Sequence, residues 1–184
     1  MTTLPYHRVN VLTGTKSARL IEDAKEYALL VNKAKRPLFV LGPDILTKAV
    51  EGRPLVEYAL DIARALDIPI CATAHTQKKL LEMGVEPSSS YDIIEIINHL
   101  KNPAWQGVKK EGNHDLVMFL GVRADLAEQG LSTLKHYASP HLKTMTLCPY
   151  YFPHASYSLP NFRKGSQWKE FLDNFIANLK KKEA

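Results

Sequence analysis

Arg36-Pro37-Leu38-Phe39-Val40-Leu41-Gly42-Pro43-Asp44 is the stretch that decides the fold. Four consecutive apolar residues lie between Pro37 and the Gly42-Pro43 pair, a pattern typical of a strand that is buried on both faces. Helical patterns lie on both sides of it, so we predict that it is the first and central strand of a parallel sheet. The Gly42 turn then lies at the edge where open α/β sheets bind their ligands.

Strand and helix patterns alternate along the rest of the chain. Apolar runs predict further strands over 68–72, 115–122, 144–148 and 155–159, and helical spacing predicts helices over 15–35, 54–66, 77–83, 93–100, 124–137 and 166–179. The expected helix caps are Thr15, Thr76, Ser89 and Ser166. This alternation predicts an α/β domain with a mostly parallel sheet and helices on both faces. At 184 residues the chain fits one domain, 1–184, with residues 1–14 as an extended N-terminal arm.

Composition narrows the class of protein. The net charge of +5 is dispersed apart from Lys180-Lys181-Lys182, where a solvated helix end explains it, so we expect no nucleic-acid partner. Cys71 and Cys148 form neither a disulfide framework nor a zinc pattern, and we expect both to be buried in a reducing environment. No signal core or membrane-spanning run is found, so the expected location is the cytoplasm.

Catalytic motifs are absent from the sequence. Gly14-Thr15-Lys16-Ser17 resembles only the end of a phosphate-binding P-loop, and no dinucleotide fingerprint or serine nucleophile motif is present. The seven histidines do not pair at the spacing of helical metal ligands. We therefore predict no catalytic residue and no metal site.

Three turns are expected to meet at the carboxyl ends of the strands: Gly42-Pro43-Asp44, Thr73-Ala74-His75 and Gly121-Val122-Arg123. Glycine permits close backbone approach and Arg123 is suited to binding a phosphate, so a nucleotide or flavin is one interpretation. Against it, Pro43 lacks a donor and Asp44 is negative; the alternative is that the glycines only turn the chain. The candidate cofactor-binding residues are Gly42, Pro43, Asp44, Thr73, His75, Gly121 and Arg123, and for His75 a surface role is the alternative.

Tyr150 to Tyr157 is a loop that is rich in aromatic residues and proline. Exposed aromatic patches usually mark interfaces, so one interpretation is a partner surface, with Trp105 as a second contact. The alternatives are that the loop folds back over the end of the sheet, or that it stacks on a flavin.

Three stretches together resemble a known family: Lys35-Arg36-Pro37-Leu38-Phe39-Val40-Leu41-Gly42; Gly112 to Val122; and Leu134-Lys135-His136-Tyr137-Ala138 leading to Cys148-Pro149-Tyr150-Tyr151-Phe152-Pro153-His154-Ala155. The chain is similar over essentially its whole length to the epsilon subunit of the archaeal acetyl-CoA decarbonylase/synthase complex, the small subunit of its carbon monoxide dehydrogenase component.

The resemblance implies a three-layer Rossmann-like domain similar to the DHS-like NAD/FAD-binding fold. It also implies an accessory subunit without its own active site, which binds and stabilises the metal-cluster catalytic alpha subunit of carbon monoxide dehydrogenase. The alternative is an FAD-binding electron-transfer module of the same complex; FAD is the only candidate cofactor. A homo-oligomer is also expected. The two isolated cysteines agree with an accessory subunit that has no metal cluster of its own, because an iron-sulfur cluster needs about four ligands.

Overall fold

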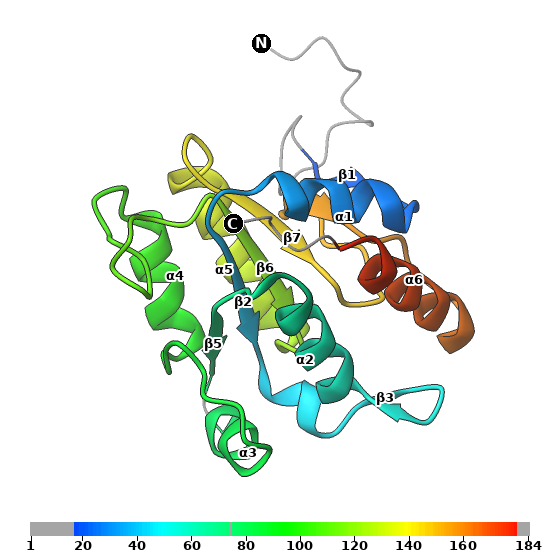
Figure 1. Cartoon of the computed structure of the whole chain (residues 1–184). Helices are drawn as coiled ribbons and strands as arrows, with labels where there is room; N and C mark the ends of the chain where they lie inside the picture. The colour runs from blue at the N-terminus through cyan, green and yellow to red at the C-terminus, as the bar shows by residue number, and fades with distance from the viewer. Residues whose placement is uncertain (1–16, 74, 180–184) are drawn as a thin grey trace, which may run out of the picture.

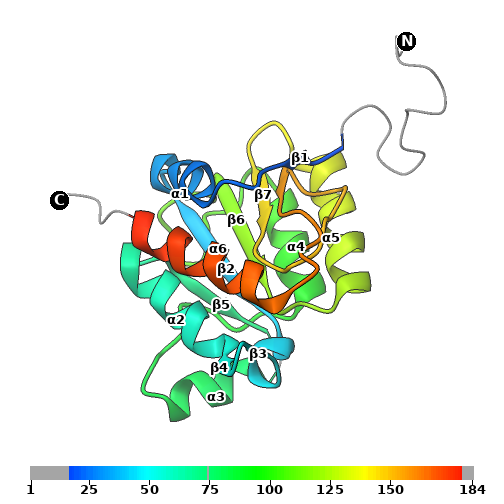
Figure 2. The ribbon, with the colours of Figure 1, turned by 90° about the vertical axis from the view of Figure 1, so that its right-hand side faces the viewer.

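A six-stranded sheet lies between two layers of helices in the computed structural model, which describes residues 17–73 and 75–179. Helices α1, α2 and α6 cover one face and α4 and α5 cover the other (Figures 1 and 2). The expected α/β class with a Rossmann-like, three-layer arrangement is confirmed. The expected arm 1–14 lies outside the described residues.

The strands of the main sheet run in the order β1-β8-β7-β6-β2-β5, and each of these neighbouring pairs is parallel. The bounds of the strands are β1 Arg19–Leu20, β2 Pro37–Leu41, β5 Ile70–Ala72, β6 Leu116–Leu120, β7 Lys143–Thr146 and β8 Tyr157–Ser158. The bounds of the helices are α1 Ala24–Lys33, η2 Pro43–Leu46, α2 Leu55–Leu66, α3 Thr76–Glu82, α4 Ile93–Lys101, α5 Ala124–Tyr137 and α6 Gly165–Asn178. A small hairpin, β3 Ala49–Val50 with β4 Arg53–Pro54, precedes α2.

The opening stretch forms β2, which lies inside the sheet between β6 and β5. Its residues alternate between two cores: Leu38 and Val40 pack toward α4 and α5, whereas Phe39 and Leu41 pack toward α1, α2 and α6. All four side chains are fully buried. Burial on both faces explains why the run contains no polar residue. The prediction of a strand here was right, but β1 precedes it in the chain and it lies next to the edge strand β5, so it is neither the first nor the central strand.

The first helix is shorter than predicted. The sequence predicted a helix over 15–35, but Arg19–Leu20 forms β1, which pairs with β8, and α1 begins only at Ala24. The Asp23 carboxylate caps this helix by accepting a hydrogen bond from the Lys25 N–H at 2.9 Å. A carboxylate at a helix start is favoured both as an acceptor and by the helix dipole, so Asp23 sets the start of α1.

Three other predicted caps were wrong. Helix α3 begins at Thr76 itself, and His75 is its N-cap residue. Helix α4 is capped by Asp92, whose carboxylate accepts the Glu95 N–H at 2.8 Å, and not by Ser89. Helix α6 begins after Lys164, so Ser166 lies inside its first turn. By contrast, α5 has the bounds that the sequence predicted, 124–137, because Gly130 is buried within it without interrupting it.

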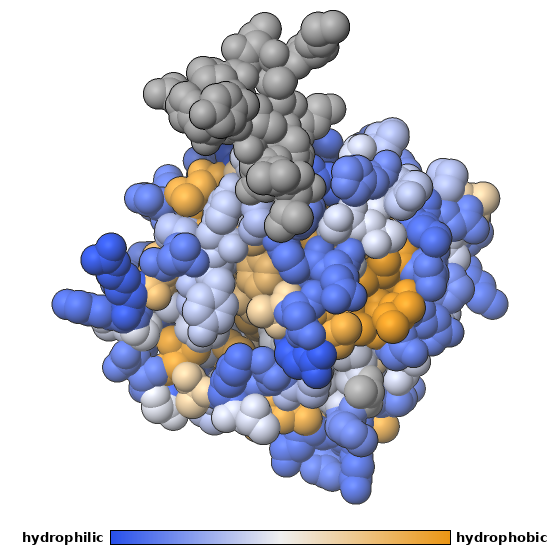
Figure 3. Space-filling view, turned by 180° about the vertical axis from the view of Figure 1, so that it is seen from behind, coloured by the Kyte–Doolittle hydropathy of each residue, from blue (hydrophilic) through white to orange (hydrophobic). Residues whose placement is uncertain are grey.

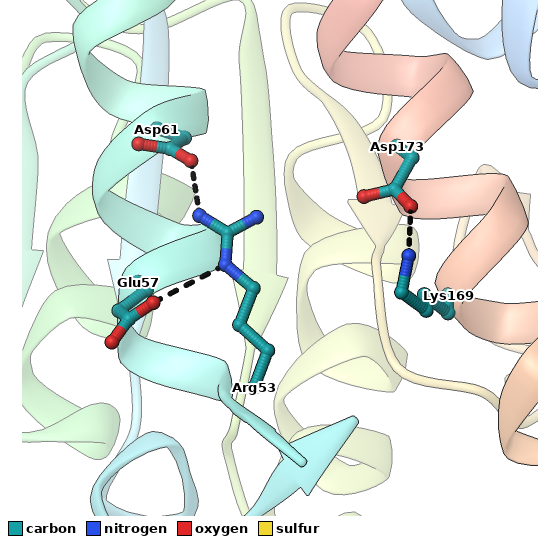
Figure 4. A network of polar contacts seen from close by, with 5 residues as sticks. All are labelled: Arg53, Glu57, Asp61, Lys169 and Asp173. Carbon is teal, nitrogen blue, oxygen red and sulfur yellow. Dashed lines mark hydrogen bonds and ion pairs between the residues drawn. The ribbon is translucent and has the colours of Figure 1, made fainter. Parts of the chain in front are cut away.

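Arg53 ties the hairpin to α2 on the side that faces α6. Its guanidinium forms ion pairs with Glu57 and Asp61, and it lies 4.2 Å from the centre of the Tyr58 ring (Figure 4). The Glu57 and Asp61 carboxylates are one turn apart on α2, so one arginine bridges both.

Within the described part of the chain, no helix is long and apolar enough to span a bilayer.

Candidate functional site

The predicted site lies at the carboxyl edge of the sheet, where the turns after β2, β6 and β5 meet. Their backbone groups bind one another: the Gly42 N–H donates to the Leu120 carbonyl at 2.9 Å, and the Asp44 N–H donates to the Gly121 carbonyl at 2.9 Å. Both the N–H and the hydroxyl of Thr73 donate to the Leu41 carbonyl at 3.0 Å. Pro43 has no N–H to donate. These donors of Gly42, Asp44 and Thr73 are therefore already used within the fold.

The two glycines at this edge serve contact between the turns. A Cβ at Gly42 would lie within 2.5 Å of Val122 Cα and closer still to the Gly121 carbonyl. Gly121 has φ +70, and a Cβ there would lie 2.8 Å from the Ile45 nitrogen. Only glycine lets the two backbones approach this closely. Of the two interpretations made from the sequence, this geometry favours glycines that turn and pack the chain.

Charged side chains at this edge are paired with each other. The Asp44 carboxylate lies 2.6 Å from Lys48 Nζ, and this hydrogen bond raises the pKa of Lys48. Arg123 binds Asp125 through two hydrogen bonds of 2.7 and 2.6 Å, which raise the pKa of Arg123 and lower that of Asp125. Both side chains are exposed, so a phosphate that binds Arg123 would have to displace Asp125 from its fork.

The space between these groups is small. A crevice of about 70 Å³ is lined by Asp44, Lys48, Gly121, Cys148 and Tyr150, among others. Of the seven predicted residues only Asp44 and Gly121 line it. Thr73 is buried, and His75 is exposed at the start of α3. Small-molecule sites usually measure about 300–1,000 Å³. FAD binding at the seven predicted residues stays a prediction, and it would require this edge to open.

Cys71 is buried as expected, whereas Cys148 is half-buried, and neither thiol is favoured as a metal ligand. Burial raises the pKa of both the Cys71 and the Cys148 thiol, whereas a metal ligand must be a thiolate. Among residues 17–73 and 75–179, no three His, Cys, Asp or Glu side chains gather in a way that would hold a metal ion.

The aromatic loop folds back onto the molecule. Phe152 and His154 are buried, His154 Nδ1 lies 3.0 Å from a carboxylate oxygen of Glu128 on α5, and the Tyr151 hydroxyl donates to the Ala18 carbonyl at 2.9 Å. Tyr150, 53% exposed, is the large side chain of this loop that faces solvent. The loop therefore covers the sheet, as one alternative had it, and offers a partner chiefly Tyr150.

Trp105, the second predicted contact, is half-buried. Its ring stacks on His99 at 5.1 Å between centroids and lies 5.7 Å from the His114 ring. On the face seen in Figure 3, hydrophobic residues form several patches that are separated by hydrophilic ones.

A larger hollow lies at the opposite edge of the sheet, which sequence reasoning did not consider. Its volume is about 670 Å³, and its lining includes Arg36 and Pro37 before and in β2, Pro69 before β5, and Gly112 and His114 before β6. The only signal in the sequence was that Lys35-Arg36 and Gly112-Asn113-His114 directly precede two buried strands. Another hollow of about 740 Å³ lies between the starts of α1 and α6.

Comparisons with known proteins find close relatives over most of the chain. The family model described as CO dehydrogenase beta subunit/acetyl-CoA synthase epsilon subunit matches residues 1–176. The acetyl-CoA decarbonylase/synthase complex subunit epsilon of Methanothermobacter thermautotrophicus is 41% identical over 167 residues, which cover 91% of each chain. Subunit epsilon 1 of Archaeoglobus fulgidus is 36% identical over 156 residues, 82% of this chain and 81% of that protein. Subunit epsilon of Methanothrix soehngenii is 30% identical over 167 residues, 87% of this chain and 86% of that protein.

Proposed function

The chain belongs to the CO dehydrogenase beta subunit/acetyl-CoA synthase epsilon subunit family, and from this premise we propose that it is a non-catalytic accessory subunit. It would bind and stabilise the metal-cluster catalytic alpha subunit of the carbon monoxide dehydrogenase component of an acetyl-CoA decarbonylase/synthase complex, in the cytoplasm. The observation that carries the proposal is the near full-length match to relatives named as epsilon subunits of that complex.

The geometry of the carboxyl edge supports a binding role over a catalytic one. Backbone donors, glycines and charged groups there satisfy one another, and the remaining crevice measures about 70 Å³. A catalytic site needs reactive groups that face a space large enough for a substrate. The described residues at this edge provide a rigid surface instead.

Within the aromatic loop, the exposed side chain of Tyr150 is the one that we favour as an anchor for docking. Its side chain is 53% exposed, while its backbone belongs to a loop whose neighbours Phe152 and His154 are buried. An aromatic residue on a rigid support loses little conformational freedom on binding, which is why tyrosine is frequent among interface hot spots. We propose that this edge, around Tyr150, contacts the catalytic subunit.

The test is complex formation between this chain and the catalytic subunit, purified anaerobically and mixed at micromolar concentration. We expect a stoichiometric complex in size-exclusion chromatography with light scattering, which also gives the oligomeric state of each chain alone. Tyr150→Ala should weaken the complex by about tenfold or more. The matched control is Tyr137→Ala, because Tyr137 is 71% exposed at the end of α5, where the chain has returned to the opposite edge of the sheet.

The two parts of the proposal fail separately. No association of the wild-type chain with the catalytic subunit would contradict the accessory role itself. A complex that Tyr150→Ala and Tyr137→Ala weaken equally, or not at all, would leave the accessory role standing and refute the docking edge.

A further inference from the structure

We propose that the hollow at the amino edge of the sheet binds a small organic anion, a molecule that carries phosphate or carboxylate groups on an organic body. This site goes beyond the proposed accessory role and shares no residue with the carboxyl edge. It lies at the ends of β2, β5 and β6 opposite their arrowheads in Figure 1.

Arg36 is the residue on which the inference rests, because neighbouring residues bind its backbone and one end of its guanidinium. Its N–H donates to the Asp115 carboxylate at 2.8 Å, and its carbonyl lies 3.0 Å from His114 Nδ1. Its side-chain Nε donates to the Asn113 carbonyl at 2.6 Å. The first two contacts fix the Arg36 backbone and the third orients its side chain, which lowers the entropy that the guanidinium loses when it binds a ligand.

The end of the Arg36 guanidinium is left without a carboxylate. Among the described residues neither Arg36 nor Arg64 forms an ion pair, although six of the other lysines and arginines do. With Nε committed to Asn113, the two terminal nitrogens of Arg36 are the donors that remain. Paired terminal N–H groups match the two oxygens of a carboxylate or phosphate.

Gly112 makes room for this guanidinium. A Cβ at Gly112 would lie 3.2 Å from Arg36 Cζ and 3.3 Å from Nη1. The backbone there has φ +110, a conformation that residues with a side chain rarely adopt. The loop before β6 is therefore shaped around the exposed Arg36 side chain.

His114 keeps that loop in place as a neutral ring. Its Nε2 accepts the Val108 N–H at 3.2 Å, so its Nδ1 is the nitrogen that carries the hydrogen and donates to the Arg36 carbonyl. Desolvation lowers the pKa of His114, which agrees with the neutral form. One buried side chain thus joins the loop, the arginine and the start of β2.

The charge and lining of the hollow fit an organic anion. Lys35, Arg36, Arg64 and Lys109 outnumber the two carboxylates of Asp67 and Glu111, and Leu66 and Pro69 are among the apolar residues of the wall. The volume of about 670 Å³ lies within the usual range of about 300–1,000 Å³ for small-molecule sites. Arg64 also complements the dipole at the end of α2, so it is an auxiliary charge.

The experiment is isothermal titration calorimetry of the full chain at low salt, with four probes. ADP carries phosphate on a planar body, citrate carries carboxylates, adenosine is neutral, and inorganic phosphate lacks the body. We expect saturable binding of ADP or citrate with a Kd below about 1 mM, weaker binding of inorganic phosphate, and none of adenosine. Binding of ADP alone assigns a phosphate-bearing ligand, and binding of citrate alone a carboxylate-bearing one.

Variants separate a fixed site from general attraction by positive charge. Arg36→Gln should weaken binding by about tenfold or more, whereas Arg163→Gln, which removes an exposed arginine from another hollow, should change the Kd by less than about twofold. Arg36→Lys, which keeps the charge but loses the fork, should be intermediate. Thermal melting of each variant comes first, and if Arg36→Gln unfolds, Arg36→Lys decides.

Three results would overturn the proposal. One is the absence of saturable binding of ADP and citrate at about 1 mM. The second is an equal loss of affinity in Arg36→Gln and Arg163→Gln. The third is an Arg36→Lys variant that binds as tightly as the wild-type chain.

Discussion

Replacing glycine by alanine at three positions separates two destabilising effects of a side chain, which are steric contact and an unfavourable backbone conformation. Gly42 has an ordinary φ, −92, but no space for a Cβ. Gly84 has φ +73 with nothing within 4 Å of a Cβ, and Gly121 has φ +70 with no space. Gly42→Ala therefore tests steric contact alone, Gly84→Ala tests backbone conformation alone, and Gly121→Ala combines them.

The magnitudes follow from these contacts. Gly84→Ala should lower the free energy of unfolding by about 1 kcal/mol, the cost of a left-handed conformation, partly offset by the lower entropy of the unfolded chain. Gly42→Ala should lower it by about 2–3 kcal/mol, because its Cβ meets backbone atoms that cannot rotate away. Gly121→Ala should approach the sum, about 3–4 kcal/mol.

The assay is urea unfolding at one protein concentration, followed by circular dichroism and by tryptophan fluorescence. For a chain of this length 1 kcal/mol corresponds to about 2–4 °C in Tm, so Gly42→Ala should melt about 4–12 °C lower. If Gly42→Ala is no less stable than Gly84→Ala, the contact between the turns does not hold the edge closed. The glycines would then have been kept for another reason, such as the close approach of a ligand.

The other predictions concern pH, the aromatic loop and flavin. Because desolvation lowers the pKa of His114 below its usual 6.5, protonation favours the unfolded chain, and the free energy of unfolding should fall as pH drops from about 6.5 through the folded pKa. His114→Gln should flatten that slope while His136→Gln, at an exposed site, leaves it; equal slopes would contradict the argument. Glu128→Gln replaces the carboxylate that lies 3.0 Å from His154 and should lower the free energy of unfolding by about 1–2 kcal/mol. Limited digestion should then show faster proteolysis within the loop. An unchanged digestion rate would count against the pairing. FAD at millimolar concentration should leave the Tm of the isolated chain unchanged, because the edge donors are engaged; a saturable rise in Tm would revive the flavin alternative.

Long apolar runs and strong helical spacing were predictable because burial dictates them directly. Strand β6 is buried at every position, as is β2 from Leu38 onward, so neither can alternate with polar residues. The bounds of α5 followed from its apolar spacing despite Gly130. The secondary structure of such segments is set by their own residues, and contacts with neighbouring elements determine only their position in the fold.

Short elements and helix starts were not predictable in the same way. Strand β1 has two residues, Arg19–Leu20, too few to show any period, and its partner β8 lies far along the chain. At helix starts several polar residues compete: Asp23 and Asp92 are the caps, although Thr and Ser lay nearby. An ionised acceptor gains from the helix dipole as well as from the hydrogen bond, which favoured aspartate.

The candidate site depends on contacts that no local pattern reveals. A glycine after a buried strand looks the same whether it admits a ligand or a neighbouring backbone, and the neighbour of Gly42 is Gly121, from a different strand. Pro43 and Asp44 did indicate the outcome, since one lacks a donor and the other repels phosphate. Two of the three stretches that carried the family resemblance pair in register along their whole strands, from Pro37 with Leu116 to Leu41 with Leu120.

These paired stretches form one structural unit with unlike ends. At the carboxyl end the backbone groups of the turns bind one another, and atoms of the facing turn occupy the space beside Gly42 and Gly121. The crevice that remains measures about 70 Å³. At the amino end the same two strands begin from an arginine that Asp115, His114 and Asn113 hold still and that faces about 670 Å³. Because the donors of Gly42, Asp44 and Thr73 are engaged within the fold, we expect a small ligand of this unit to bind through side chains at the other end. Binding at the carboxyl edge that survives Arg36→Gln would refute this reasoning.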